Sequence, residues 1–298
     1  MTSLRGVLLL VMLGGTGPAA AADSTCGARS REVAASLGRA RLAMSPEAAV
    51  RASFEGAVRA LAECVGDEEL WYLLVRSAEL GGGVFPTQVA NSTVADLKAA
   101  VELAARRNPR SARIATIRAR VIGGLQAARQ AVALDPAYAP AQVTLAAALF
   151  AARDAKAARS VLAARTDLAR VPGACALLAR ACLAEGDASE AIAVAEREPA
   201  PSALDLYEPG ARDERPRRDA VEVAGLAYLH SGQFDPAAQR LLQAAAEGSA
   251  AARTALETGS PELRRALDRL ARRKGLAPRE RALLRELKTP PARRTHPQ

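Results

Sequence analysis

The sequence predicts an all-α protein made of stacked helical hairpins, and three observations support that class. Half of the residues are hydrophobic but only 3% are aromatic, and the apolar residues are mostly Ala, Leu and Val. Such side chains favour closely packed helices, whereas sheets are richer in β-branched and aromatic residues. Asn108-Pro109 and Asp135-Pro136 interrupt segments whose apolar residues have helical spacing. Similar helix–turn–helix patterns then recur along the chain, so we expect an internal repeat.

The first 22 residues have the three parts of a secretory signal peptide. Arg5 supplies the positive charge, residues 6–13 form a short apolar run, and Ala20-Ala21-Ala22 offers a small-residue cleavage site. The apolar run is shorter than the roughly 20 residues that span a bilayer, and no later segment is apolar enough to be a transmembrane helix. We therefore expect an exported protein, periplasmic or extracellular, that begins near Asp23.

Four cysteines remain after cleavage, and export makes disulfides chemically reasonable. Cys175 and Cys182 lie seven residues apart in one expected helix, which is too far for a disulfide, so we expect two buried free thiols. Cys26 and Cys64 form either a bridge that contributes about 2–4 kcal/mol or a second pair of free thiols. Because no Cys-x-x-Cys or Cys/His cluster is present, no metal site is predicted.

The N-terminal part of the mature chain is expected to contain less regular hairpins. One helix is predicted from Glu32 to Ala43 and its partner from Ser53 to Cys64. A further helix is predicted from Val94 to Arg107, where Thr93 with Asp96 resembles a capping box. The preceding residues, GGGVFPTQVANS, are interpreted as a loop, because they begin with three glycines and contain a proline.

The clearest repeat follows Pro136 and comprises three hairpins. Their turns are expected at Arg153-Asp154, at Gly186-Asp187, which lies 33 residues further on, and at Gly232-Gln233. Small residues 12 positions apart flank each turn, so they face each other across an antiparallel hairpin and let the backbones approach closely. These pairs are Ala146 and Ala158, Ala179 and Ala191, and Gly225 and Ala237.

These hairpins resemble the tetratricopeptide repeat (TPR), a helix–turn–helix unit of about 34 residues with conserved large, small and Tyr-like positions and a closing Pro. The resemblance is strongest from Gly124 to Gly248, and Asp135-Pro136 matches the closing position. Trp71, Leu74 and Ala78 match first-helix positions of an earlier, degenerate unit. The resemblance implies a right-handed superhelical solenoid of the exported bacterial type, with about five hairpins and a C-terminal cap.

The expected organisation follows from these assignments. Terminal repeats need a cap because an open end exposes an apolar face, and Pro261 to Arg272 and Pro278 to Leu287 have the pattern of two amphipathic, externally charged helices. The segments are a signal peptide (1–22), an N-terminal hairpin (23–66), degenerate TPR-like units (67–136), TPR-like units with a loop at 199–218 (137–258), capping helices (259–288) and a disordered tail (289–298).

The family resemblance also implies a binding surface. In TPR proteins the first helices of successive units line a concave groove that holds peptides or partner helices. Members that grip acidic C-termini use Lys and Asn at two groove positions, and neither is present here. Arg76 and Arg180 are either partners for a carboxylate or ordinary solvated arginines. Carried over by position, the groove residues are Tyr72, Arg76, Glu79, Val143, Phe150, Arg180, Leu183, Leu226 and His230.

No residue pattern predicts catalysis. His296 lies in the expected tail, and His230 stands next to Ser231, a spacing at which helical side chains do not face each other. Asp67-Glu68-Glu69 is interpreted as a helix start that suits the helix dipole. The prediction is therefore a non-enzymatic scaffold that binds another protein or peptide, with no cofactor, metal or small-molecule substrate.

The net charge of +9 raises one alternative. Clustered Lys and Arg bind phosphate polymers, but most arginines are scattered among acidic residues along the helices and are interpreted as solvating. We favour the protein partner over nucleic acid. The alternative is a binder of nucleic acid or another polyanion that uses Arg264, Arg265, Arg269, Arg272, Arg273 and Lys274 in the basic C-terminal region.

Overall fold

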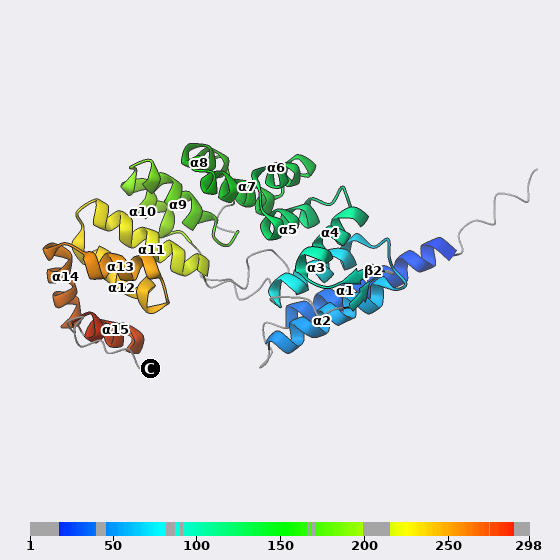
Figure 1. Cartoon of the computed structure of the whole chain (residues 1–298), viewed down its shortest axis with the longest axis horizontal. Helices are drawn as coiled ribbons and strands as arrows, with labels where there is room; N and C mark the ends of the chain where they lie inside the picture. The colour runs from blue at the N-terminus through cyan, green and yellow to red at the C-terminus, as the bar shows by residue number, and fades with distance from the viewer. Residues whose placement is uncertain are drawn as a thin grey trace, which may run out of the picture. The chain divides into compact units, whose positions relative to one another are not determined.

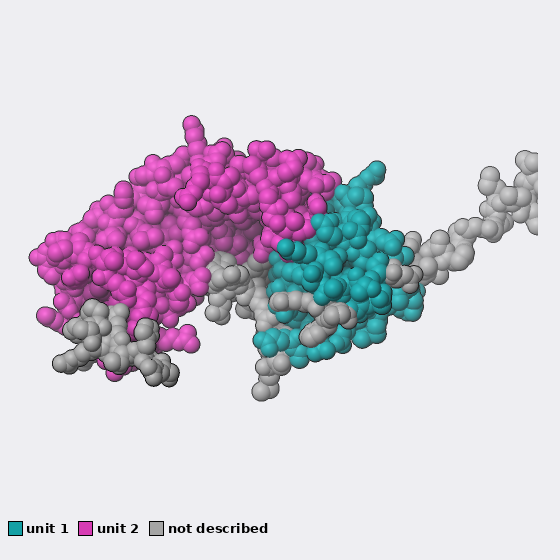
Figure 2. All heavy atoms as spheres, in the orientation of Figure 1, with its two compact units in different colours: residues 1–114 teal, residues 115–298 magenta. Residues whose placement is uncertain are grey.

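A computed structural model describes residues 18–39, 46–81, 87–89, 92–165, 167, 171–198, 215–273 and 275–288. The predicted all-α class is confirmed there, since these ranges contain fifteen helices and one two-stranded sheet (Figure 1). The chain divides into two compact units, residues 1–114 and residues 115–298 (Figure 2). Within the described ranges, no helix is both long enough and apolar enough to cross a membrane.

Unit 1 is built around one helix that is buried on all sides. α3 (Glu68–Leu80) packs against α1 (Pro18–Arg39), α2 (Pro46–Leu61) and α4 (Leu97–Arg107). Every residue of α3 from 70 to 78 is buried, including Trp71 and Arg76, whereas α1, α2 and α4 each alternate between buried and exposed positions. A helix that is buried all round forms the core of its unit.

Two connections fix the end of α2 beside α3. Cys26 in α1 and Cys64 just after α2 form a disulfide, with their Cα atoms 5.7 Å apart. The indole Nε1 of Trp71 donates a hydrogen bond to the Val65 carbonyl at 2.7 Å. The disulfide closes a loop of 38 residues, for which the chain-entropy relation gives a contribution of about 4 kcal/mol.

Three expectations for unit 1 are corrected by the structure. α1 begins at Pro18, well before Glu32, because the alanines after Pro18 are strong helix formers, and it is described as far as Arg39, so the predicted end at Ala43 lies outside the described residues. The connection after α3 is not entirely loop, since β1 (Thr87–Val89) pairs antiparallel with β2 (Ser92–Val94). β2 therefore contains Thr93, and Asp96 alone caps α4 by accepting a hydrogen bond from the Ala99 N–H at 2.8 Å.

Several expectations lie outside the described residues. They are the signal peptide up to residue 17, most of the loop at 199–218, Lys274 and the tail at 289–298. The described part of the loop, from residue 215 onward, is already helical, because it begins α11. α1 also runs through the predicted cleavage site at Ala20-Ala21-Ala22.

Unit 2 is a succession of short helices. α5 spans the boundary with unit 1, α6 packs on α7, and α12 packs on α13, α14 and α15. Of these helices, α13 was not predicted from the sequence. The helices are α5 (Ala112–Ile122), α6 (Leu125–Leu134), α7 (Ala139–Ala151), α8 (Ala155–Ala163), α9 (Ala174–Ala184), α10 (Ala188–Ala195), α11 (Arg215–His230), α12 (Phe234–Ala246), α13 (Ala250–Thr258), α14 (Pro261–Ala271) and α15 (Pro278–Lys288).

The three predicted hairpins are α7–α8, α9–α10 and α11–α12, which pack as pairs and contact one another in order. Their turns lie at the expected places, and each has one residue in the left-handed region: Arg153 (φ 67°), Gly186 (φ 85°) and Gly232 (φ 74°). Asp154 and Asp187 then cap α8 and α10 by accepting hydrogen bonds from backbone N–H groups three residues on.

The small residues inside the hairpins are buried as predicted. Ala146 and Ala158 are both fully buried, as are Ala179 and Ala191 in the next hairpin. A Cβ added to Gly225 would lie 2.8 Å from Cγ of Leu241 and 3.0 Å from its backbone nitrogen. α11 therefore approaches α12 too closely for any side chain at that position.

The connection between α6 and α7, which precedes the first of these hairpins, has the predicted turn. α6 ends at Leu134, and the Asp135 carboxylate accepts a hydrogen bond from the Ala137 N–H at 2.9 Å. Pro140 lies in the first turn of α7, where its missing N–H costs no hydrogen bond. The two prolines around Tyr138 therefore mark a boundary between stacked helices.

Candidate functional site

Unit 2 presents a row of half-buried apolar side chains along α7, α9 and α11. α7 contacts α9, and α9 contacts α11, so these first helices of consecutive hairpins are neighbours. Val143, Phe150 and Leu183 are partly exposed and pack against the core formed by the first two hairpins. Leu226 is also partly exposed and packs against the core of the C-terminal helices. We call Val143, Phe150, Arg180, Leu183 and Leu226 the first-helix face.

Arg180 is the charged residue in the middle of this face. Its Nη2 lies 3.4 Å from a carboxylate oxygen of Asp219 and 3.4 Å from one of Glu222, both on α11. These distances are long for charge-assisted hydrogen bonds. The arginine side chain is 35% exposed, and its Nε and Nη1 groups have no partner in the part of the chain that the structure describes. Arg180 is therefore charge-balanced but keeps open donors.

Glu222 extends this contact into a polar chain across three helices. Its second carboxylate oxygen accepts a hydrogen bond from the Ser249 hydroxyl at 2.6 Å. Ser249 in turn caps α13, because its Oγ accepts a hydrogen bond from the Ala252 N–H at 3.0 Å. This series of polar contacts was not predicted from the sequence. Because the Ser249 hydroxyl holds the Glu222 carboxylate in place, it also fixes the position of an acidic partner of Arg180.

Tyr72 and Arg76 do not lie on an accessible groove, which corrects the prediction for α3. Both residues are almost completely buried. The Arg113 guanidinium lies 3.6 Å from the centre of the Tyr72 ring, and Arg76 forms an ion pair with Glu79 at 2.5 Å. These residues have the same repeat position as the first-helix face, but they form an interior polar cluster.

A signal for this burial was present in the sequence. Residues 70–75 of α3 are six consecutive apolar residues, LWYLLV. A helix that is apolar on every side is buried on every side. The position of Tyr72 in the repeat predicted the direction of its side chain. It did not predict that Arg113 covers the ring.

His230 lies exposed at the last turn of α11. The Ser231 hydroxyl donates its hydrogen bond to the Tyr228 carbonyl and not to the imidazole. The arrangement therefore contains no Ser–His pair.

The two cysteines of unit 2 are free and buried, as predicted. Burial raises the pKa of the Cys175 thiol to about 11 and also raises that of Cys182. Because the thiolate is the nucleophilic form, neither residue is suited to attack a substrate. Among the described residues, no cluster of three or more His, Cys, Asp or Glu side chains is placed to hold a metal ion.

Many arginines of unit 2 connect one hairpin to the next. Arg159 contacts Glu185 and Asp187 across the α8–α9 junction, and Arg240 pairs with Glu196 at 2.6 Å. The C-terminal region continues this pattern, since Arg269 pairs with Asp235 at 2.7 Å. Much of the positive charge is therefore balanced within the chain.

The basic C-terminal region is also partly neutralised. Of the residues proposed for polyanion contact, Arg265 pairs with Glu262 and Arg269 with Asp235. Arg264, Arg272 and Arg273 are exposed. These pairs weaken the electrostatic basis of the polyanion alternative.

Comparison with solved structures identifies the architecture. The chain is similar to PilW, described as a widely conserved type IV pilus biogenesis factor, with a TM-score of 0.51 and 16% sequence identity over 78% of this chain and 98% of that one. The chain has a TPR-like fold. It is likewise similar to a chain of the APC/C hetero-tetramer Cut9–Hcn1, with a TM-score of 0.54 and 13% identity.

The second TPR-like match covers 82% of this chain but only 46% of the solved one, so the protein spans less than half of that relative. Neither a protein-family model nor a curated protein matches the sequence. At these identities, the structural similarity concerns the fold alone.

Proposed function

We propose that this TPR-like protein is an exported, non-enzymatic scaffold that binds a partner protein or peptide through the first-helix face of unit 2. The observation that carries the proposal is the row of half-buried apolar side chains on α7, α9 and α11, with Arg180 at its centre. Such a surface combines apolar contact area with a few oriented polar groups, as protein interfaces do.

Two features of the face favour a protein chain as the ligand. The apolar residues come from the first helices of three successive hairpins, so an extended or helical segment can contact all of them at once. The open guanidinium donors of Arg180 supply a directional contact for a carbonyl or carboxylate. Phe and Arg are both enriched at protein interfaces, and Arg is among the residue types that often dominate interface energies, so we expect Phe150 and Arg180 to contribute most.

Export is supported by chemistry at the N-terminal end. The Cys26–Cys64 disulfide persists in oxidising compartments and is rare in the reducing cytosol. The signal-peptide pattern of residues 1–22 points in the same direction. The test is mass spectrometry of the protein from its native host. A chain that begins near Asp23 with no free thiol at Cys26 supports export, and an intact Met1 with a free Cys26 contradicts it.

The binding surface is tested with matched variants. Phe150→Asp and Leu183→Asp place a charge on the first-helix face, whereas Ser160→Asp and Gln239→Asp place the same charge on exposed second-helix positions. We expect a partner recovered by the wild-type chain to bind at least about tenfold more weakly to the face variants and unchanged to the controls. Circular dichroism and thermal melts check that all four variants fold. Equal binding by folded face and control variants rejects the surface.

A further inference from the structure

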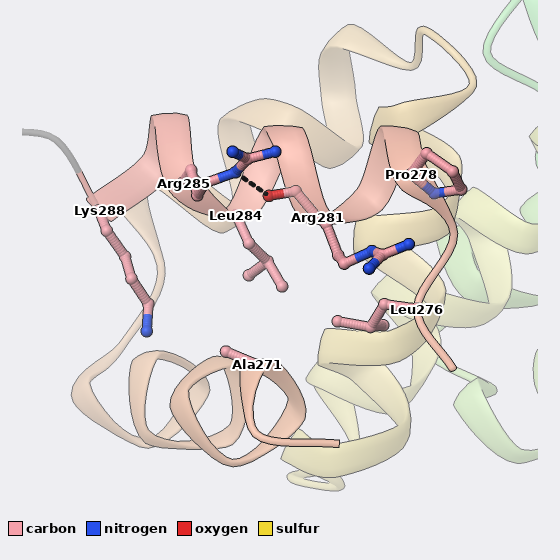
Figure 3. Close-up of a pocket in the computed structure, with 7 residues that line it drawn as sticks. All are labelled: Ala271, Leu276, Pro278, Arg281, Leu284, Arg285 and Lys288. Carbon is pink, nitrogen blue, oxygen red and sulfur yellow. Dashed lines mark hydrogen bonds between the residues drawn. The ribbon is translucent and has the colours of Figure 1, made fainter. Parts of the chain in front are cut away.

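A second surface lies at the C-terminal end of unit 2, between α14 and α15. α15 packs mainly against α12 and meets α14 over only a short stretch. A pocket of about 530 Å³ remains between them. Leu276 and Leu284 point into this space, and Ala271 of α14 faces them from the opposite side (Figure 3). The pocket therefore has apolar walls from α14, from α15 and from the connection between them.

Cationic side chains flank the apolar centre of this pocket. Arg281 lies about one turn before Leu284 on α15, and Lys288 lies about one turn after it (Figure 3). Lys288 pairs with Asp268 at 2.9 Å. Arg281 has no ion pair in the described part of the chain, so its guanidinium is a cation at the pocket without an acidic partner. Arg285 also lines the pocket, and its Nε donates a hydrogen bond to the Arg281 carbonyl.

The distribution of charge identifies the chemistry of an occupant. An apolar side chain that enters between Leu276 and Leu284 removes apolar surface from water. An acidic residue about one turn from it on a helix lies on the same helical face, where it can reach Arg281. The chain's own residues 289–298 are poorly suited to this role, because they contain Arg293 and Arg294 but no Asp or Glu.

We propose that the pocket between α14 and α15 docks a helix of a partner protein that carries an apolar residue flanked by acidic residues one turn away. This surface is separate from the first-helix face and gives the scaffold a second attachment point. A scaffold with two such surfaces binds two partners, or two segments of one partner. When both segments belong to one partner, the gain in overall affinity is set by the effective concentration of the second segment.

The test is selection from a displayed library of helical peptides. The bait is the mature chain carrying Phe150→Asp and Leu183→Asp, so binders of the first-helix face are removed in advance. The same bait with Arg281→Glu is selected in parallel. We expect the first selection to enrich an apolar residue flanked by Asp or Glu, and the Arg281→Glu bait to lose those peptides or enrich Lys and Arg at the flanking positions.

The control is Arg279→Glu, which changes an exposed arginine on the same helix that does not line the pocket. The acidic consensus should survive this change. Failure to enrich a consensus, enrichment that Arg281→Glu leaves unaltered, or equal loss with Arg279→Glu overturns the proposal. Dodecanoate is measured in parallel, and its Arg281-dependent binding without a peptide consensus assigns the pocket to a small anionic amphiphile instead. None of these outcomes depends on the first-helix face.

Discussion

α3 in unit 1 and α9 in unit 2 carry an arginine at the same repeat position, yet the two arginines lie in different environments. The Arg76 side chain is 2% exposed and pairs with Glu79 on its own helix. The Arg180 side chain is 35% exposed and contacts Asp219 and Glu222 on the following first helix. Repeat position therefore does not determine whether a residue is available to a partner.

The sequences of the two helices explain the difference. α3 contains large apolar residues on every side, including Trp71 and Leu73, so burial on all faces stabilises it. α9 has mainly Ala and Cys on its buried side, and its partly exposed positions include Leu177, Arg180 and Leu183. Unit 1 is thus closed around one helix, whereas unit 2 leaves one side of its first helices accessible.

The largest expected difference between the units comes from the disulfide. Replacing both Cys26 and Cys64 with Ser should lower the stability of unit 1 by about 4 kcal/mol, since the bridge no longer restricts the unfolded chain. Unit 2 should be unaffected, because the bridge joins two residues of unit 1. Hydrogen exchange followed by mass spectrometry measures both units in one sample. An equal loss of protection in α9 and α3 contradicts the expected independence.

The next largest effect concerns the two arginines themselves. Arg76→Ala removes one partner of a largely buried ion pair with Glu79. This change should lower the stability of unit 1 by about 3 kcal/mol. Arg180→Ala removes a partly exposed contact and should cost less than about 1 kcal/mol. Urea unfolding of the two variants gives both values. Similar losses of stability in the two variants would contradict the expectation that the buried arginine contributes more than the partly exposed one.

A smaller effect is expected at the hairpin turns of unit 2. Arg153 has a φ of 67° where the other two turns have glycine, so Arg153→Gly should stabilise the chain by about 1 kcal/mol. Gly186→Ala should destabilise it by a similar amount, since no atom lies within 4 Å of the added Cβ and only the backbone conformation opposes the change. Thermal melts of both variants provide the comparison, and shifts of the same sign would contradict it.

The smallest effect is a pH dependence at the turn of the second hairpin. The Glu190 backbone N–H and then the Arg159 guanidinium lower the pKa of Asp187, so its charged form stabilises the folded chain. That contribution is present above the unfolded value of about 3.9 and is lost as the pH falls through the lower folded value. Asp187→Asn keeps a capping side chain but cannot ionise. The Asp187→Asn variant should therefore be less stable than wild type at neutral pH, and the two proteins should be equally stable in strong acid.

Local chemistry made the helical class and the hairpin turns predictable. Asp154 and Asp187 are capping residues at fixed places, and the Ala146–Ala158 spacing follows from antiparallel packing. The β1–β2 hairpin was missed because two three-residue strands give too short a pattern of alternation.

The candidate site was less predictable, because exposure depends on contacts between residues far apart in sequence. Tyr72 is covered by Arg113, which lies beyond the whole of α4. Arg180 is balanced by acids 39 and 42 residues further on. The sequence placed Phe150, Leu183 and Leu226 at equivalent positions of successive first helices, but their partial exposure comes from the packing of whole hairpins.

Site-specific photo-crosslinking of the mature chain to its partner tests the first-helix face directly. A benzophenone amino acid is placed at Phe150 or Leu183 on the first-helix face, and at Ser160 or Gln239 on exposed second-helix positions. The expected result is one partner crosslinked from Phe150 and Leu183 and none from Ser160 or Gln239. Crosslinking of that partner from the second-helix positions alone would contradict the assignment of the first-helix face as the binding surface.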